Sequence, residues 1–411
     1  MRVTFVKTAI QKYLKTDVDY VIKNGLWLTI SHIIGVTASI ALAIAFANLV
    51  PASVYGQYSF IMSVTVIIGA FSLTGLQTAV TKVVAQGYGG SLKRAVLQSF
   101  KWSSGVVIMS LGMSIYYLAK ENEILFWSFL ISAVCIPITA SFSLYKNYLD
   151  GIKKFKDTAF LFSLEKIIIT TVLIFVLFYS KNIILIVLAF FLTGSIFAFI
   201  FYLYTVRVYT PNSKEAADLL NFSKHLSAMN ILKIVSGQID KVLMFQFLGA
   251  TQLAIYAFAK APITELGMSN RIIANLALPK LSEQTYAEIK ASLPRKVLLL
   301  TLLMIVIVSF YIYFSSVLFK VVFPQYLSAI IYSQIYSLTL IFSPTILFNK
   351  ALVVHKKLKP LYIIKITIPI LKVGLMVLFI PIYGMWGAIG SLLFCDFVKM
   401  IMLTFSFYQQ K

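Results

Sequence analysis

Long apolar stretches alternate with short polar connections along the whole chain. Because an α-helix rises about 1.5 Å per residue, about 20 apolar residues cross the hydrocarbon core of a bilayer. Twelve segments approach or exceed that length, at residues 25–49, 57–80, 102–119, 125–147, 158–180, 183–206, 219–248, 252–275, 297–322, 327–350, 360–382 and 385–408. This pattern predicts an all-α polytopic membrane protein with twelve transmembrane helices.

Composition supports this interpretation. The chain has 411 residues, of which 60% are hydrophobic and 12% charged, whereas about a quarter of the residues in soluble domains are charged. The net charge of +22 does not indicate nucleic-acid binding, because the basic residues form short clusters between apolar stretches. Residues 1–24 are polar and basic and the first apolar stretch is too long for a signal-peptide core, so no cleavable signal peptide is expected.

The connections predict the topology. Lys and Arg are frequent in residues 1–24 and absent from the connection around residues 50–56, and this alternation of basic and weakly charged connections continues through all twelve segments. Because cytoplasmic loops carry the excess of Lys and Arg, we expect both termini on the cytoplasmic side. The connections are too short to fold as separate domains, so the function is expected within the membrane.

A weak internal repeat suggests two halves. Phe46–Phe60 can be laid beside Phe245–Phe258, with Leu49 matching Leu248. The match relates the first hairpin to the fourth, as in transporters built from repeats. It predicts two pseudo-symmetric six-helix bundles of the same orientation. The expected parts are a cytoplasmic N-terminal segment (1–24), an N-terminal bundle (25–206), a cytoplasmic linker (207–218) and a C-terminal bundle (219–408).

Charged residues inside the apolar segments are the candidates for function, since each costs about 2.5–3.5 kcal/mol to insert and normally faces protein or water. Eight are basic and four acidic: Lys166, Lys233, Lys241, Lys260, Arg271, Lys365, Lys372 and Lys399 against Glu165, Asp240, Glu265 and Asp396. The excess predicts a water-filled cavity with a cationic lining, suited to an anionic substrate such as a phosphate. Alternatively, the charges only neutralise one another in a packed bundle, and Lys365 and Arg271 extend to the interface.

Equal depth in a hairpin predicts which charges can pair. With Ala250 and Gly384 as the hairpin tips, the predicted pairs are Asp240–Lys260, Lys233–Glu265 and Lys372–Asp396, whereas Lys241 and Lys399 have no obvious partner. Pro262 lies between Lys260 and Glu265 and is a candidate hinge, although static kinks at proline are common. His32 in the first segment is interpreted as a helix-packing residue, because a lone histidine in such a segment more often packs than functions.

Several stretches resemble a known family. The run IDKVLMFQFLGATQLAIYAFA, with an acid, a base, a short turn and a Tyr-Ala pair, resembles the seventh-to-eighth helix signature of bacterial polysaccharide flippases. VPASVYGQYSF resembles their first hairpin, GLQTAVTKVVA their second helix end, and IPIYGMWGAIGSLLF the hairpin before their last helix. These are the polysaccharide transporters, or O-antigen flippases, of the multidrug/oligosaccharidyl-lipid/polysaccharide exporter superfamily.

The resemblance implies a flippase in the bacterial inner membrane. Two bundles would alternate between inward- and outward-open states and carry an oligosaccharide on a polyprenyl pyrophosphate to the outer leaflet, coupled to H⁺ or Na⁺. The cationic cavity residues are expected to be Lys233, Lys241, Lys260, Lys372 and Lys399, and the ion-coupling acids Asp240, Glu265 and Asp396. Partners would be the lipid-linked substrate, membrane lipids, and the polysaccharide polymerase with its chain-length machinery.

Other functions stay open at this point. An exporter of drugs from the same superfamily would have a net acidic cavity, whereas export of lipid II is chemically close to the favoured function. A membrane-embedded polymerase or glycosyltransferase belongs to another class, but such enzymes usually carry a sizeable outer loop, and the outer connections here are very short. No catalytic residue, cofactor or metal is expected, and the two cysteines, Cys135 and Cys395, both lie in apolar segments.

Overall fold

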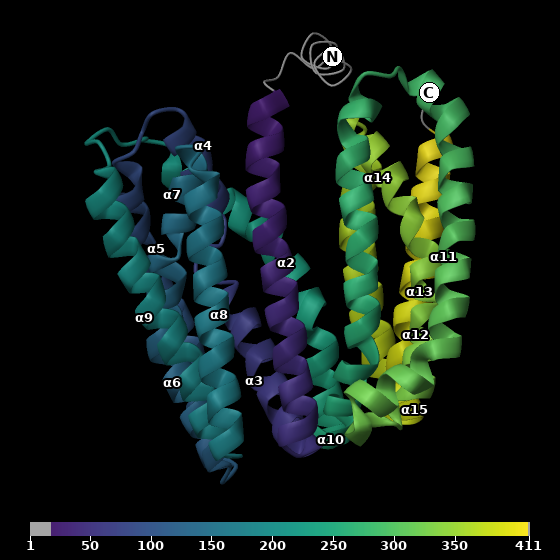
Figure 1. The fold of residues 1–411 in the computed structure, drawn as a ribbon, viewed down its shortest axis with the longest axis horizontal. Coiled ribbons are helices and arrows are strands. Elements are labelled where there is room, and N and C mark those ends of the chain that lie inside the picture. Colours follow the sequence, from purple (N-terminus) through teal and green to yellow (C-terminus); the bar gives the residue numbers. More distant parts are fainter. Residues whose placement is uncertain (1–17, 410–411) are drawn as a thin grey trace. The chain divides into compact units, whose positions relative to one another are not determined.

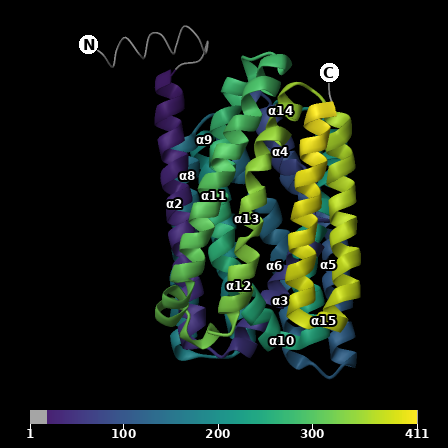
Figure 2. The same cartoon turned by 90° about the vertical axis from the view of Figure 1, so that its right-hand side faces the viewer.

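The computed structural model describes the backbone of residues 18–409 and the side chains of residues 25–409, except those of 268–273, 275–276 and 278–280. Every regular element in this part of the chain is a helix, which confirms the all-α expectation (Figures 1 and 2). The elements are α2 (Val18–Leu49), α3 (Ala52–Gly69), α4 (Leu76–Ala85), α5 (Ser91–Ala119), α6 (Glu123–Phe142), α7 (Leu144–Gly151), α8 (Phe155–Tyr179), α9 (Ile183–Tyr209), α10 (Leu219–Ser282), α11 (Tyr286–Val322), η1 (Pro324–Tyr326), α12 (Ala329–Ser337), α13 (Thr339–Phe342), η2 (Ser343–Thr345), α14 (Ile346–Val354) and α15 (Leu358–Gln409).

Ten helical stretches among the described residues are long and apolar enough to cross a membrane. Two of them are interrupted by a glycine with positive φ: Gly249 (φ 81°) inside α10 and Gly384 (φ 58°) inside α15. Glycine adopts this conformation readily because it has no Cβ. The chain folds back at both positions, and Figure 2 shows the two parts of α15 side by side. Gly384 is the predicted tip, and the other turn lies one residue before the predicted Ala250.

One predicted continuous segment, 57–80, is wrong, whereas 125–147 and 327–350 each correspond to one stretch that is long and apolar enough to cross a membrane and have only local interruptions. Segment 57–80 is divided by the turn after α3, where Leu73 has a φ of 63°. Segment 125–147 is interrupted at Ser143, between α6 and α7. Segment 327–350 consists of α12, α13, η2 and most of α14. Pro344 in η2 has no N–H to continue an α-helical ladder, which favours this break.

Two helices, α5 and α11, begin eleven residues before their predicted segments. α5 begins at Ser91 rather than at residue 102, and α11 begins at Tyr286 rather than at residue 297. Hydropathy alone missed these polar first turns. The start of α11 has a capping box, in which the Thr285 side chain accepts from the Glu288 N–H while the Glu288 carboxylate accepts from the Thr285 N–H.

The contacts divide the chain into two compact units. Unit 1 contains the described residues up to Ala45 together with Ile68–Asn230, and unit 2 contains Phe46–Ile67 and Ile231–Lys411 as far as it is described. The residues around α3 therefore group with unit 2, and the first turns of α10 group with unit 1. The division into bundles at 25–206 and 219–408 stays a prediction.

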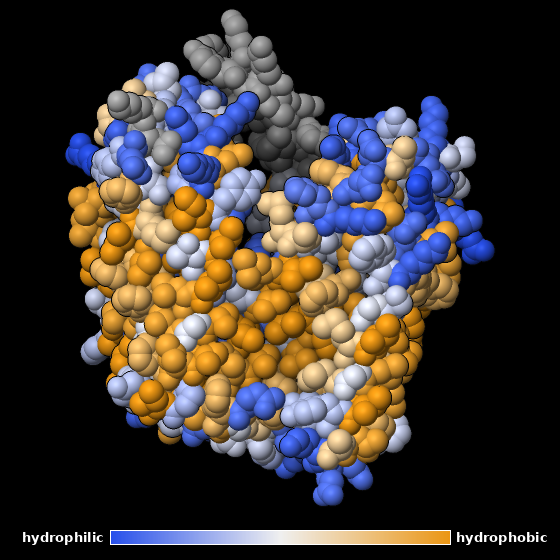
Figure 3. Space-filling view, turned by 180° about the vertical axis from the view of Figure 1, so that it is seen from behind, coloured by the Kyte–Doolittle hydropathy of each residue, from blue (hydrophilic) through white to orange (hydrophobic). Residues whose placement is uncertain are grey.

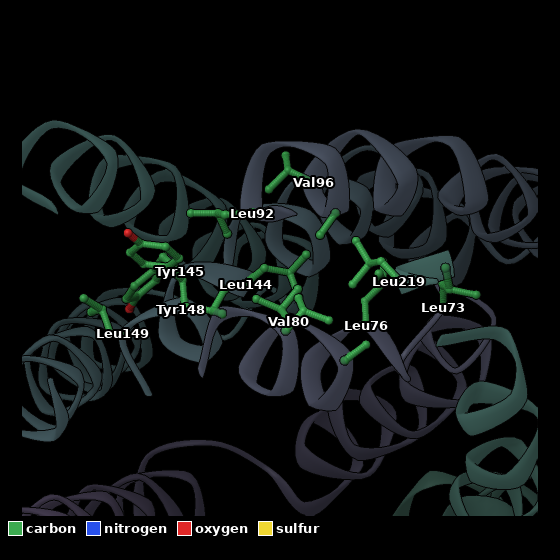
Figure 4. Packing of buried hydrophobic residues seen from close by; sticks show 14 of the residues in the cluster. Leu73, Leu76, Val80, Leu92, Val96, Leu144, Tyr145, Tyr148, Leu149 and Leu219 are labelled. Atoms are coloured by element: carbon green, nitrogen blue, oxygen red, sulfur yellow. The ribbon is translucent and has the colours of Figure 1, made fainter. Parts of the chain in front are cut away.

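Unit 1 has a hydrophobic core formed by its short helices. Leu76 and Val80 of α4 pack with Leu92 and Val96 of α5, with Leu144 and Tyr145 of α7, and with Leu219 at the start of α10 (Figure 4). Burial of each such side chain contributes about 1.5–3 kcal/mol relative to exposure in water. This core fixes α7 beside α8, where a buried ion pair lies.

The outer surface of each unit suits a lipid environment. Figure 3 shows hydrophobic side chains over the middle of the visible face of both units and hydrophilic side chains towards the ends. On α11, large apolar side chains such as Val306, Phe310 and Val321 are exposed. Exposed apolar side chains of this density are expected where a helix faces hydrocarbon rather than water.

Candidate functional site

A buried carboxylate forms the centre of the candidate site in unit 2. Asp240 lies in the first half of α10, and its side chain is 1% exposed. Its Oδ2 accepts hydrogen bonds from the Tyr256 hydroxyl, at 2.7 Å, and from the Lys260 ammonium. Lys372 of α15 places its Nζ 3.6 Å from Asp240 Oδ1. We call Asp240, Tyr256, Lys260 and Lys372 the Asp240 cluster.

The turn at Gly249 is what brings this cluster together. Asp240 precedes the turn and Tyr256 and Lys260 follow it, so two parts of α10 meet across the hairpin. The predicted Asp240–Lys260 pair is therefore confirmed. The Tyr256 hydroxyl also lies 3.1 Å from Lys260 Nζ, so the tyrosine joins the acid and the base in one network. Sequence reasoning missed Tyr256, although it lies one turn before Lys260 and therefore on the same helix face.

The other two predicted pairs are wrong. Lys372 does not pair with Asp396; its ammonium donates to the Ser236 carbonyl at 2.7 Å and contacts Asp240. Equal depth in the α15 hairpin was not sufficient, because the Lys372 side chain is directed at α10 rather than at the second half of α15. Lys233 and Glu265 are both described, and no ion pair within 4.0 Å joins them.

Charge in and beside the cluster is not balanced. Asp240 carries one negative charge, whereas Lys260 and Lys372 carry two positive charges, and Lys241 follows Asp240 directly in the chain. Asp240 Oδ1 has no hydrogen-bond partner among the described residues, although Lys372 is near. Buried ion pairs cost desolvation energy that their attraction only partly returns, so an unbalanced cluster is expensive in a purely structural role.

A cavity in unit 2 lies beside the cluster. Its volume is about 640 Å³, and its lining includes Lys233, Lys399 and Asp396 together with polar side chains of α13, η2 and α14. Tyr336 lines the same cavity, and its ring centre lies 5.6 Å from Lys260 Nζ. We call this space the C-terminal cavity. Tyr336 therefore lies next to both the Lys260 ammonium and the C-terminal cavity.

Most of the predicted site residues fall into two groups. One group lies in the Asp240 cluster and the other lines the C-terminal cavity. The first contains Lys260, Lys372 and Asp240, and the second contains Lys233, Lys399 and Asp396.

The other predicted residues of α10 lie next to one group or the other. Lys241 is half-buried and follows Asp240 in the chain. Glu265 is half-buried on the second part of α10, next to Thr264, which lines the cavity. The helix continues through Pro262, since Gly249 is the only non-helical position of α10 among the described residues.

Unit 1 contains a second buried ion pair that sequence reasoning missed. Lys146 Nζ of α7 lies 2.8 Å from Glu165 Oε2 of α8, and the Tyr145 hydroxyl donates to the same oxygen at 3.1 Å. Lys146 and Lys166 lie 5.3 and 5.8 Å from the Phe162 ring centre. We call Tyr145, Lys146 and Glu165 the Glu165 cluster. The sequence marks Lys146 only as a topology signal, because it lies at the edge of its apolar segment.

Among the described residues, the remaining candidates do not belong to either cluster or to the lining of the C-terminal cavity. His32 and Lys365 are exposed, and the Arg271 side chain lies outside the described residues. No group of three or more His, Cys, Asp or Glu side chains that could hold a metal ion occurs among the described residues. Cys135 and Cys395 are buried and free.

Comparison with solved structures identifies the fold. The chain is similar to an outward-facing and an inward-facing multidrug resistance MATE family transporter of the MOP superfamily. For the first the TM-score is 0.64 at 13% identity, with 94% of each chain covered, and for the second it is 0.62 at 14% identity, with 93% of this chain and 97% of the other covered. A third similar structure, a MOP superfamily transporter from Pyrococcus furiosus, has a TM-score of 0.58 at 13% identity and 95% coverage of both chains. At these identities the likeness shows the fold alone.

Sequence comparison identifies the family. A Shigella flexneri protein described as "Putative O-antigen transporter" is 21% identical over 329 residues, which cover 74% of this chain and 77% of that protein. These relatives are transporters by description, not enzymes, in agreement with the expectation that the chain is not an enzyme. Residues 21–284, more than half of the chain, match the family described as polysaccharide biosynthesis protein. The chain therefore belongs to the polysaccharide biosynthesis protein family, on the fold of the MOP superfamily transporters.

Proposed function

We propose that this protein is a flippase that moves a polyprenyl-pyrophosphate-linked oligosaccharide, such as an O-antigen or capsule repeat unit, from the cytoplasmic to the outer leaflet of a bacterial inner membrane. Family membership and the O-antigen transporter similarity support the substrate class. The observation that carries the proposal is the excess of lysine at the Asp240 cluster and the C-terminal cavity, inside a chain built from apolar helices.

The proposed topology has twelve transmembrane helices with both termini in the cytoplasm. Ten apolar helical stretches, two of which are divided by Gly249 and Gly384, give twelve segments when each divided stretch counts as two. The distribution of Lys and Arg in the connections supports the orientation. Two bundles of six helices, 25–206 and 219–408, would alternate between inward- and outward-open states, as related folds are described in both.

The cavity lysines are the proposed contact for the pyrophosphate. Lys233 and Lys399 are exposed side chains in the cavity lining, where a flexible ammonium can follow a moving phosphate. Lys260 and Lys372 hold Asp240, and with Lys241 they keep the surroundings of the cavity positive. A substrate with negative charge is favoured over a cationic drug, because Lys233, Lys350 and Lys399 outnumber Asp396 in the lining.

Asp240, Glu265 and Asp396 are the proposed ion-coupling acids. A proton bound to Asp240 would remove the charge that holds Lys260 and Lys372, and so release the ammonium groups for the substrate. Pro262 is the proposed hinge, since it lies between Lys260 and Glu265 on α10. H⁺ or Na⁺ is the coupling ion under this proposal, and the polysaccharide polymerase with its chain-length machinery would receive the product.

The experiment is a leaflet assay in proteoliposomes. Purified protein is reconstituted with a lipid-linked oligosaccharide, and the fraction that becomes accessible to an impermeant glycosidase is followed with and without an ion gradient. Gradient-dependent transfer supports the proposal. Transfer of a cationic drug but not of the lipid-linked sugar would favour the drug exporter, and elongation of the sugar chain would indicate a polymerase; either result contradicts the proposal.

A further inference from the structure

Unit 1 has a groove along α5 whose lining shares no residue with either ion cluster. Its volume is about 620 Å³. The walls are the side chains of α5 between Gln98 and Met109, together with Phe71 from the turn after α3. The polar members, Gln98 and Lys101, lie near the start of this stretch, and the apolar members, Ile108 and Met109, lie at its end. The groove therefore changes from polar to apolar along the helix.

The length of α5 places the polar end at a membrane interface. Lys101 and Lys120 flank an apolar stretch and are 19 residues apart, which corresponds to about 28 Å of helix. This distance matches the hydrocarbon thickness of a bilayer, about 30 Å. Trp102 beside Lys101 is typical of an interfacial position. Ile108 follows seven residues after Lys101, so the apolar end lies about 10 Å deeper.

Two lysines give the polar end a positive charge that is not neutralised. Lys224 of α10 places its Nζ 5.4 Å from the Trp102 ring centre, and Lys101 lines the groove itself. Neither ammonium has a carboxylate within 4.0 Å among the described residues. Both side chains are exposed, so each can attract an anion at the membrane surface.

The apolar end is open to the surrounding lipid. Ile108 is 69% exposed, and nothing lies within 4 Å of the position that a Cβ on Gly105 would occupy. A single hydrocarbon chain can therefore lie against Gly105 and between Ile108 and Met109 while its headgroup stays at Lys101. The occupant that fits both ends is an amphipathic molecule with a negative headgroup that reaches the groove from the bilayer.

We propose that this groove binds a phospholipid with an anionic headgroup, whose phosphate contacts Lys101 and Lys224 and whose acyl chain runs along Gly105 to Met109. The site shares no residue with the Asp240 cluster and does not depend on the transported substrate. Interfacial lysines contribute about 1 kcal/mol each towards anionic lipid, so the loss of both lowers affinity by about thirtyfold.

Native mass spectrometry of the full-length protein in detergent tests the proposal. The protein is titrated with phosphatidylglycerol and with phosphatidylcholine of the same acyl chains. We expect phosphatidylglycerol to bind preferentially, and the Lys101→Gln/Lys224→Gln double variant to lose that preference. The matched control is Lys93→Gln, which removes an exposed lysine of α5 outside the groove and should leave binding unchanged.

The apolar end has its own test. Gly105→Leu fills the groove and should weaken phosphatidylglycerol binding at least tenfold, whereas Gly112→Leu, at an equally open glycine of α5 outside the groove, should not. Equal binding of both lipids, an unchanged preference in the double lysine variant, or equal effects of the two glycine variants would overturn the proposal. So would binding of polyprenyl pyrophosphate, but not phosphatidylglycerol, that depends on Lys101 and Lys224.

Discussion

The Asp240 cluster and the Glu165 cluster have the same chemistry and different surroundings. In each, a buried carboxylate accepts a hydrogen bond from a tyrosine hydroxyl and forms an ion pair with a lysine ammonium. Glu165 and its partners come from the neighbouring helices α7 and α8, and Tyr145 also belongs to the hydrophobic core of unit 1. Asp240 has a second lysine from α15, and its partner Lys260 lies near Tyr336, which lines the C-terminal cavity.

This difference separates a packing role from a role in transport. Glu165 contacts one lysine and one tyrosine, and these contacts join two adjacent helices. A carboxylate with two lysines leaves positive charge in apolar surroundings, which is tolerated more easily if an anion or water can reach it. We therefore expect mutations in unit 1 to change stability, and mutations in unit 2 to change transport.

The largest effect on transport is expected for Lys260→Ala. Without this ammonium, Asp240 loses one of its two lysine partners and the surroundings of the cavity lose one positive charge. Transport per folded molecule should therefore fall at least tenfold in the proteoliposome assay. Lys146→Ala is the matched change in unit 1 and should keep transport within about twofold of wild type after correction for folded protein. Equal losses of transport in the two variants would show that the two clusters do not differ in function.

The largest effect on stability is expected for Lys146→Ala. Breaking a buried ion pair from one side costs about 3–5 kcal/mol, because the other charge stays buried without its counter-charge. Thermal unfolding in detergent should therefore occur at a clearly lower temperature. Adding Glu165→Gln removes the unpaired charge and should restore much of the loss. A double variant as unstable as the single one would show that Glu165 is not the cause.

An intermediate effect on transport is expected for Lys372→Ala. Its ammonium lies 3.6 Å from Asp240 and is also held by the Ser236 carbonyl, so it is a weaker partner than Lys260. We expect a several-fold loss of transport rate with normal insertion. Activity equal to wild type in both Lys372→Ala and Lys260→Ala would remove the cluster from the mechanism.

The smallest effects are expected at the cavity lysines. Lys233→Gln and Lys399→Gln each remove one exposed charge whose field is screened by salt. The substrate concentration for half-maximal transport should rise about two- to fivefold, more at low ionic strength. Lys320→Gln, at an exposed lysine of α11 outside the cavity, is the control and should leave this concentration unchanged.

Hydropathy and glycine placement predicted much of the fold. The apolar segments became helices, and Gly384 marks one hairpin turn as expected. The breaks at Ser143 and in the turn before α4 were not predictable in this way, because apolar character does not tell whether one long helix or two short ones bury a stretch. Polar first turns, as in α5, were missed for the same reason.

Depth along a helix predicted one ion pair and failed for two. It gave Asp240–Lys260 because both residues lie in one hairpin with a sharp turn. It could not give the direction of Lys372, which depends on how α15 is rotated beside α10. It also missed the Lys146–Glu165 pair. Lys153 lies in the turn between α7 and α8, and Lys146 lies seven residues before it whereas Glu165 lies twelve residues after it. The two residues therefore differ in depth by about 8 Å, which only a long side chain can span.

Under the proposed function, the C-terminal cavity is filled with water and admits the phosphorylated headgroup. Cysteines introduced at Thr264 and Asn349 in the cavity wall can be tested for reaction with a membrane-impermeant thiol reagent, with Val306→Cys on the exposed apolar face of α11 as the control. We expect Thr264→Cys and Asn349→Cys to react, the lipid-linked oligosaccharide to slow both reactions, and Val306→Cys to stay unlabelled. Cavity cysteines that do not react, or that react at the same rate with and without substrate, would contradict the proposed function.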